Sequence, residues 1–129
     1  MTLMFLNGGA MRGGPLHHLL QDAPLVGVVR TAPKYHFYSV GDAFPAIEAV
    51  ESGGVSVVGE LYDVPWDVLE RSLLPAEPEE LELGVIELED GGGTLSMVRR
   101  RAYTEPHTYR DISHHADWRA YKASLEAAQ

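Results

Sequence analysis

The chain has 129 residues, about the length of one domain, and 45% of them are hydrophobic, which is enough to bury one core. Its net charge of −9 disfavours nucleic-acid binding, because an acidic surface repels phosphate backbones. The absence of cysteine excludes disulfides and thiolate chemistry. The apolar opening over residues 1–6 is too short for a signal sequence or a membrane span, so we expect a cytoplasmic protein with no membrane partner.

Short runs rich in β-branched and aromatic residues, punctuated by Gly and Pro, fill most of the chain. They predict strands over Leu3–Leu6, Leu25–Val29, Tyr35–Val40, Val55–Tyr62, Gly84–Glu89 and Thr94–Tyr103. The separator Asp90-Gly91-Gly92-Gly93 is typical of a hairpin turn between the last two runs. In the strand before this turn, the alternation of side chains leaves Val85 on the solvent side together with Glu87.

Helical spacing occurs in three segments: Pro15–Gln21, Pro65–Leu74 and the C-terminal segment. In the last of these, Ser113 is the predicted N-cap, and an apolar stripe runs through Trp118, Tyr121, Leu125 and Ala128. No linker separates two cores, so we expect one domain over residues 1–129. Many strands with few helices predict an α+β fold, a small mixed β-barrel with flanking helices.

A glycine loop, running from Asn7 to Pro15, follows the first predicted strand directly. Glycines let a backbone turn with its N–H groups outward, so such a loop can bind a carboxylate or phosphate. It lacks the lysine and the spacing of a nucleotide-binding loop. We predict that Gly8, Gly9 and Ala10 bind a small carboxylate; the alternative is a plain glycine-rich turn.

Two further side chains are candidates for the same pocket. Arg30 ends a predicted strand, where a guanidinium can bind a carboxylate bidentately, and Tyr35 supplies a hydroxyl. The alternative places the arginine at a loop rim and the tyrosine in the core.

Carboxylates are concentrated between Glu60 and Asp90. Within this acidic run Glu77 precedes a proline, which favours extended geometry, and burial at a pocket mouth would raise its pKa and suit it to act as a general base. Glu105 is the second candidate. The alternative is a solvated acidic loop, in which case the face from Glu77 to Asp90 would dock a partner.

The six histidines form no metal-ligand pattern. The adjacent pairs His17-His18 and His114-His115 point apart along the chain, whereas ligands on a helix converge at a spacing of four. We therefore expect no metal and no cofactor.

Four segments together resemble the C-terminal domain of allophanate hydrolases, a member of the γ-glutamylcyclotransferase-like fold. They are Arg30-Thr31-Ala32-Pro33 with Tyr35, Gly59-Glu60 with Tyr62 and Val64-Pro65, Leu83 to Gly91, and Asp111-Ile112-Ser113 with Trp118 to Tyr121. The resemblance covers nearly the whole chain and implies a small β-barrel with one pocket beside the glycine loop.

In cyclotransferases the loop amides hold the amino-acid end of a γ-glutamyl substrate, and a glutamate acts as acid and base. By order along the chain Glu77 matches that glutamate, with Glu79 and Glu80 as competitors. In this chain Asn7 replaces the loop tyrosine of cyclotransferases, and Ala10 replaces the loop histidine of the allophanate hydrolase domain.

The resemblance implies a small carboxylated amide or urea, or a γ-glutamyl compound, as substrate. In allophanate hydrolases this domain assists decarboxylation after an amidase domain has acted. No amidase segment is present in these 129 residues, so the expected partners are the small carboxylate and a separate amidase, with a homodimer left open. Whether the chain is an enzyme or a non-catalytic binding or docking module is also left open.

Overall fold

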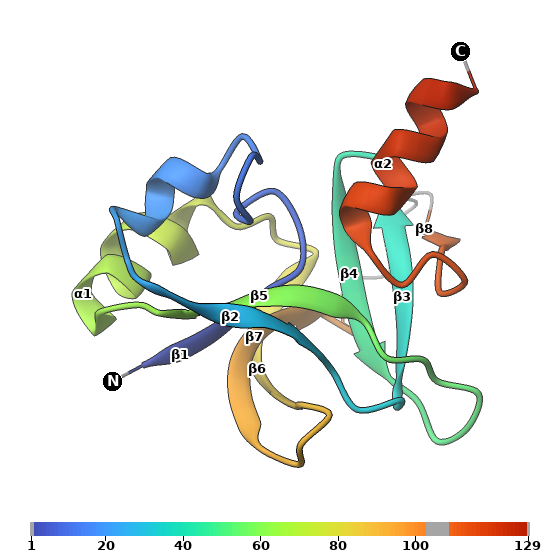
Figure 1. The fold of residues 1–129 in the computed structure, drawn as a ribbon, viewed down its shortest axis with the longest axis horizontal. Coiled ribbons are helices and arrows are strands. Elements are labelled where there is room, and N and C mark those ends of the chain that lie inside the picture. The colour runs from blue at the N-terminus through green and yellow to red at the C-terminus, as the bar shows by residue number, and fades with distance from the viewer. Residues whose placement is uncertain (1, 103–108, 129) are drawn as a thin grey trace.

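The computed structural model describes residues 2–102 and 109–128, and these residues form two β-sheets and a few short helical segments (Figure 1). A five-stranded sheet has the order β2-β5-β1-β7-β6, and a three-stranded sheet has the order β4-β3-β8. The strands are β1 (Leu3–Leu6), β2 (Leu25–Arg30), β3 (Tyr35–Val40), β4 (Phe44–Ala49), β5 (Val58–Asp63), β6 (Leu81–Glu87), β7 (Gly93–Arg99) and β8 (Tyr109–Asp111). The expected α+β class is therefore confirmed.

The helical segments lie on two sides of the sheets (Figure 1). A 3-10 turn, His17–Leu20, lies near α1 (Trp66–Val68), which continues as a π turn over Leu69–Leu73 and a 3-10 turn over Leu74–Ala76. The longest helix, α2 (Trp118–Ala127), lies on the other side beside β3 and β4. Within the described part of the chain, no helix combines the length and the apolar character needed to cross a membrane.

A closed barrel is not confirmed. The five-stranded sheet ends at β2 and β6. In the described residues these edges meet at an isolated bridge between Thr31 and Leu88, with hydrogen bonds from the Glu89 amide to the Arg30 carbonyl at 2.9 Å and from the Ala32 amide to the Glu87 carbonyl at 3.0 Å. Both bridge residues lie just beyond the ends of their strands. The sheet therefore comes together at one end and stays open along the rest of its edges.

The hydrophobic core is built around β1, the central strand of the larger sheet. Met4 and Phe5 of this strand are fully buried. Gly59 on the neighbouring strand β5 lies directly under the Phe5 ring, because an added Cβ would come within 2.4 Å of that ring. Any larger residue at position 59 would push the two strands apart, so the close approach requires glycine.

The C-terminal helix is attached to this core by its first two turns. Trp118 and Tyr121 are buried as the apolar stripe predicts, whereas Leu125 is only partly buried. The N-cap prediction is wrong: the Asp117 carboxylate accepts the Arg119 amide at 3.0 Å and caps α2. Ser113 instead accepts the Phe37 amide at 3.0 Å and connects the chain to β3.

Candidate active site

The glycine loop after β1 and the segment after the helical turns of residues 66–76 line one cavity of about 250 Å³. Its walls are largely apolar, with Leu16 from the end of the loop and side chains from both sheets: Phe5, Leu6, Phe44, Leu81 and Met97. Among the described residues that line it, Glu77 is the only one that can ionise. The cavity thus places one carboxyl group opposite the backbone of the loop.

Glu77 has the local conformation that its sequence predicts. It ends the 3-10 turn with extended dihedral angles (φ −75°, ψ 142°), immediately before Pro78. Its side chain is partly buried in the apolar cavity, and this burial raises the pKa of Glu77 to about 7. A carboxyl group with this pKa is present in both protonation states near neutral pH, as a general acid and base must be.

The loop opposite Glu77 is held by its carbonyl groups. Gly8 O accepts the Met11 amide at 3.1 Å, Gly9 O accepts the Leu16 amide at 2.9 Å, and His17 Nδ1 lies 3.0 Å from Ala10 O. The N–H groups of Gly8, Gly9 and Ala10 have no hydrogen-bond partner in the described parts of the chain. Three donors of the cavity wall are therefore available to a bound oxygen atom.

Two further features of the loop concern the shape and polarity of the cavity. An added Cβ on Gly8 would come within 2.7 Å of Pro45 Cδ, so only glycine allows the loop to approach β4 this closely. The side-chain Nδ2 of Asn7 is buried and has no partner within residues 2–102 and 109–128. A buried donor without a partner carries a free-energy cost.

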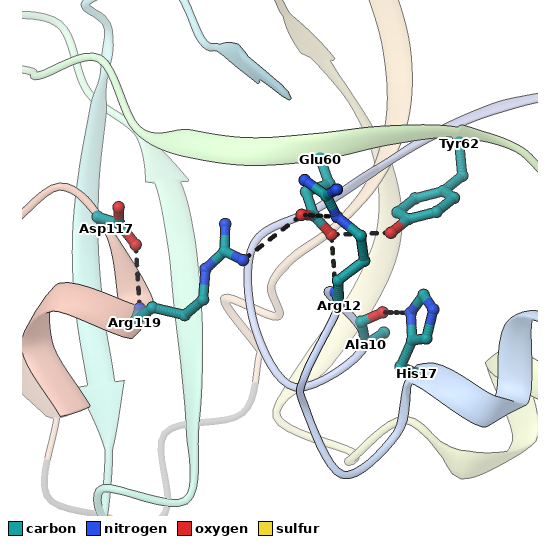
Figure 2. A network of polar contacts seen from close by, with 7 residues as sticks. All are labelled: Ala10, Arg12, His17, Glu60, Tyr62, Asp117 and Arg119. Carbon is teal, nitrogen blue, oxygen red and sulfur yellow. Dashed lines mark hydrogen bonds and ion pairs between the residues drawn. The ribbon is translucent and has the colours of Figure 1, made fainter. Parts of the chain in front are cut away.

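A buried carboxylate fixes the far end of the loop to β5 (Figure 2). Glu60 is fully buried, and its Oε1 accepts the Arg12 amide and the Tyr62 hydroxyl, each at 2.8 Å. Its Oε2 accepts Arg12 Nε at 2.8 Å and lies 3.5 Å from Arg119 Nη1. The loop is therefore attached through both the backbone and the side chain of Arg12.

The charges of this network follow from burial and hydrogen bonding. Burial by itself would raise the pKa of Glu60, but the bonds from Arg12 and Tyr62 outweigh it, so that the pKa is lowered and the group stays ionised. Burial, together with the bond to Glu60, raises the pKa of Tyr62 to about 12, so its hydroxyl keeps its proton. The sequence analysis named Glu60 only within the family resemblance and not as a site residue. The local feature that could have pointed to it is a charged residue within an apolar strand.

The remaining predicted site residues lie elsewhere. Gly8, Gly9, Ala10 and Glu77 share the cavity, but Arg30 lines a different cavity of about 400 Å³ at the β2 edge. Tyr35 is buried, and its hydroxyl accepts the amide of residue 87 at 2.8 Å. Arg30 and Tyr35 therefore do not line the cavity beside the glycine loop, contrary to the prediction. Glu105, the second predicted catalytic residue, lies outside the described residues.

The carboxylates of the acidic run have different surroundings in the structure. Glu87 pairs with Lys34 at 3.1 Å and Glu82 with Arg100 at 3.6 Å, while Glu77 faces the cavity. The competitors Glu79 and Glu80 are not among the described residues that line this cavity. Within the described residues, no three His, Cys, Asp or Glu side chains are grouped to hold a metal ion.

Comparison with known proteins gives a consistent relationship. A family model described as allophanate hydrolase C-terminal domain matches residues 2–123. Urea amidolyase of Saccharomyces cerevisiae is 25% identical over 126 residues, which cover 92% of this chain but only 7% of the yeast protein.

Solved structures share the fold. The crystal structure of a uropathogenic E. coli-specific protein superposes with a TM-score of 0.85 at 33% identity and covers 95% of both chains. Kluyveromyces lactis allophanate hydrolase superposes with a TM-score of 0.87 at 24% identity, over 96% of this chain and 21% of that one.

Proposed function

Because the chain belongs to the allophanate hydrolase C-terminal domain family, of the γ-glutamylcyclotransferase-like fold, we propose that its cavity binds a small carboxylated amide or urea, or a γ-glutamyl compound. We propose further that Glu77 transfers the proton in the reaction of this substrate. The observation that carries the proposal is the pairing of one carboxyl group of pKa about 7 with the free amide groups of the opposite wall.

The donors of the loop account for binding. The N–H groups of Gly8, Gly9 and Ala10 can hold the oxygen atoms of a carboxylate or amide, and the apolar walls pack against its carbon atoms. No cation lines the cavity among the described residues. A negatively charged ligand therefore enters most favourably when Glu77 is protonated, which links binding to proton uptake.

The same carboxyl group suits both reactions that the family implies. With a γ-glutamyl amide, whose ammonium and carboxylate charges cancel, Glu77 acts from its ionised form. The substrate's amine attacks its side-chain carbonyl, and Glu77 takes the proton from the attacking nitrogen and gives it to the nitrogen that leaves. With the N-carboxylated product of an amidase, the bond from nitrogen to the carboxylate carbon breaks, carbon dioxide leaves, and the nitrogen takes the proton from Glu77. The loop amides stabilise the negative oxygen that develops in the first case.

The relatives suggest where the substrate comes from. The chain corresponds to a small part of urea amidolyase, and the corresponding part of Kluyveromyces lactis allophanate hydrolase is likewise a fraction of that chain. We propose that residues 1–129 form one domain that acts on the product of an amidase. In this proposal a separate amidase supplies the carboxylated intermediate.

Activity on the two substrate types tests the proposal. The chain is incubated either with a γ-glutamyl amide or with allophanate plus an amidase, and formation of 5-oxoproline or release of carbon dioxide is followed. We expect turnover that falls by a factor of about 100 or more in Glu77→Gln, the usual loss for a general acid or base. Glu70→Gln, which changes an exposed carboxylate outside the cavity, is the matched control and should retain activity.

The outcomes separate the two classes of function. Turnover that survives in Glu77→Gln would contradict the catalytic role of Glu77. Saturable binding of 5-oxoproline without turnover of either substrate would identify the chain as a non-catalytic carboxylate-binding module. Absence of both binding and turnover would overturn the proposed function.

A further inference from the structure

The glycine loop has a second face that the proposed function does not use. A groove of about 300 Å³ lies between this face and the first turns of α2, and it shares Gly8 and Gly9 with the cavity described above. Three cationic side chains line it: Arg12 from the loop, with Arg119 and Lys122 from α2. Among its described lining residues Glu126 is the only acidic one. In a chain of net charge −9, this is a marked local excess of positive charge.

The two arginines share one counter-charge (Figure 2). Arg12 Nε and Arg119 Nη1 lie 2.8 Å and 3.5 Å from the same oxygen, Oε2 of Glu60. Glu60 is fully buried and carries a single negative charge, so it cannot neutralise both guanidinium groups. One positive charge is left over at the floor of the groove.

Both guanidinium groups are held in place yet still accessible. The side chains of Arg12 and Arg119 are 53% and 46% exposed. A guanidinium has five N–H donors, and each of these uses one of its nitrogen atoms on Glu60. The other donors have no partner in the described portion of the chain. Orienting the groups in advance lowers the entropy cost of binding a ligand.

Lys122 adds a third charge. Its Nζ donates to the Asp42 carbonyl at 2.9 Å and lies 5.6 Å from the centre of the Trp118 ring. These two contacts keep the ammonium group over the first turns of α2, on the same groove as the arginines. Counted with Glu60 and Glu126, these three cations leave one net positive charge, and a ligand that bridged them would meet three cationic donors.

We propose that this groove is a second binding site, for a small phosphate-type oxyanion with at least two negative charges. Two guanidinium forks match the oxygen atoms of a tetrahedral oxyanion, and Lys122 matches its second charge. The inference goes beyond the proposed function, since it involves neither Glu77 nor the cavity. An acidic protein segment is the competing occupant, but the groove's small volume and shared arginine floor favour a small ligand.

Titration of the chain with inorganic pyrophosphate at constant ionic strength tests the proposal, followed by amide NMR shifts and calorimetry. We expect saturable binding with shifts at residues 11–14 and in the first turns of α2. Arg12→Gln and Arg119→Gln should each weaken binding about tenfold or more, the effect of losing hydrogen bonds to a charged group. Arg71→Gln, an exposed arginine outside the groove, is the matched control and should bind normally.

Two further variants keep the result interpretable. Lys122→Gln leaves the contacts of Glu60 intact, so its expected weakening of several-fold cannot come from a loss of that network. Glu77→Gln should leave pyrophosphate affinity unchanged, which separates this site from the cavity. Absence of saturation, equal weakening in Arg71→Gln, or full affinity in both Arg12→Gln and Arg119→Gln would overturn the proposal.

Discussion

Replacing Glu77 by glutamine is expected to stabilise the protein at alkaline pH. Burial raises the folded-state pKa of Glu77 to about 7 from an ordinary 4.5, whereas the unfolded chain keeps the ordinary value. Between these two values the folded state binds one more proton than the unfolded state, so the free energy of unfolding falls as pH rises. The free-energy cost of burying ionised Glu77 is absent at pH values below its pKa in the unfolded chain. It is fully present at pH values above its pKa in the folded protein.

The size of the effect follows from the two pKa values. Each unit of difference corresponds to about 1.4 kcal/mol, and because the carboxyl group is partly exposed we expect roughly 2–3 kcal/mol in total. Glutamine cannot ionise and keeps nearly the same shape. Glu77→Gln should therefore match the wild type near the unfolded pKa and exceed it by this amount above pH 7.

Urea unfolding at about pH 5 and about pH 8 measures this difference. Glu70→Gln serves as the control, since it changes the same type of residue at an exposed position. We expect the wild type and Glu70→Gln to lose stability in parallel between the two pH values, and Glu77→Gln to lose less. If all three proteins changed by the same amount, the assignment of a raised pKa to Glu77 would be refuted.

Three further substitutions test the scaffold of the site. Glu60→Gln should lower the free energy of unfolding by about 3 kcal/mol, because it breaks a buried pair with Arg12. In the wild type, the stabilisation from this pair should be lost as the pH falls through the lowered pKa of Glu60. Urea unfolding measures both effects. Trp118→Ala should cost about 3–5 kcal/mol of stability through the cavity it leaves, while calorimetry should show 5-oxoproline affinity unchanged. Gly8→Ala should weaken 5-oxoproline binding about tenfold in the same assay and cost about 1–3 kcal/mol, because its Cβ would press against Pro45.

Local sequence signals predicted six of the eight strands in the described residues and missed β4 and β8. The hairpin of β6 and β7 follows from its glycine turn, and Val85 is 73% exposed, as the alternation of side chains predicts. Strand β8 has only three residues, and β4 contains a residue that is unusual in a central strand, Pro45. It is compatible with β4 because that strand lies at an edge, where one side of the backbone is unpaired.

The site shows the same division between local and long-range information. The glycine loop and Glu77 carry local signals, a run of glycines and a following proline, and the structure brings them to one cavity. The placement of Arg30 depends on which strand β2 pairs with, and no local pattern contains that information. Likewise Asp117, rather than Ser113, caps α2 because the chain turns at Ala116 with a positive φ of 54° just before the helix.

The affinity of 5-oxoproline as a function of pH tests the central claim most directly, because the ligand's carboxyl group stays ionised throughout the range. If the ligand binds between the loop and a protonated Glu77, its affinity in the wild type should fall by roughly tenfold to thirtyfold between about pH 5.5 and about pH 8.5, as the competent fraction falls. In Glu77→Gln the affinity should stay constant over the same range. An affinity that does not depend on pH in the wild type, or that falls equally in the variant, would contradict the account.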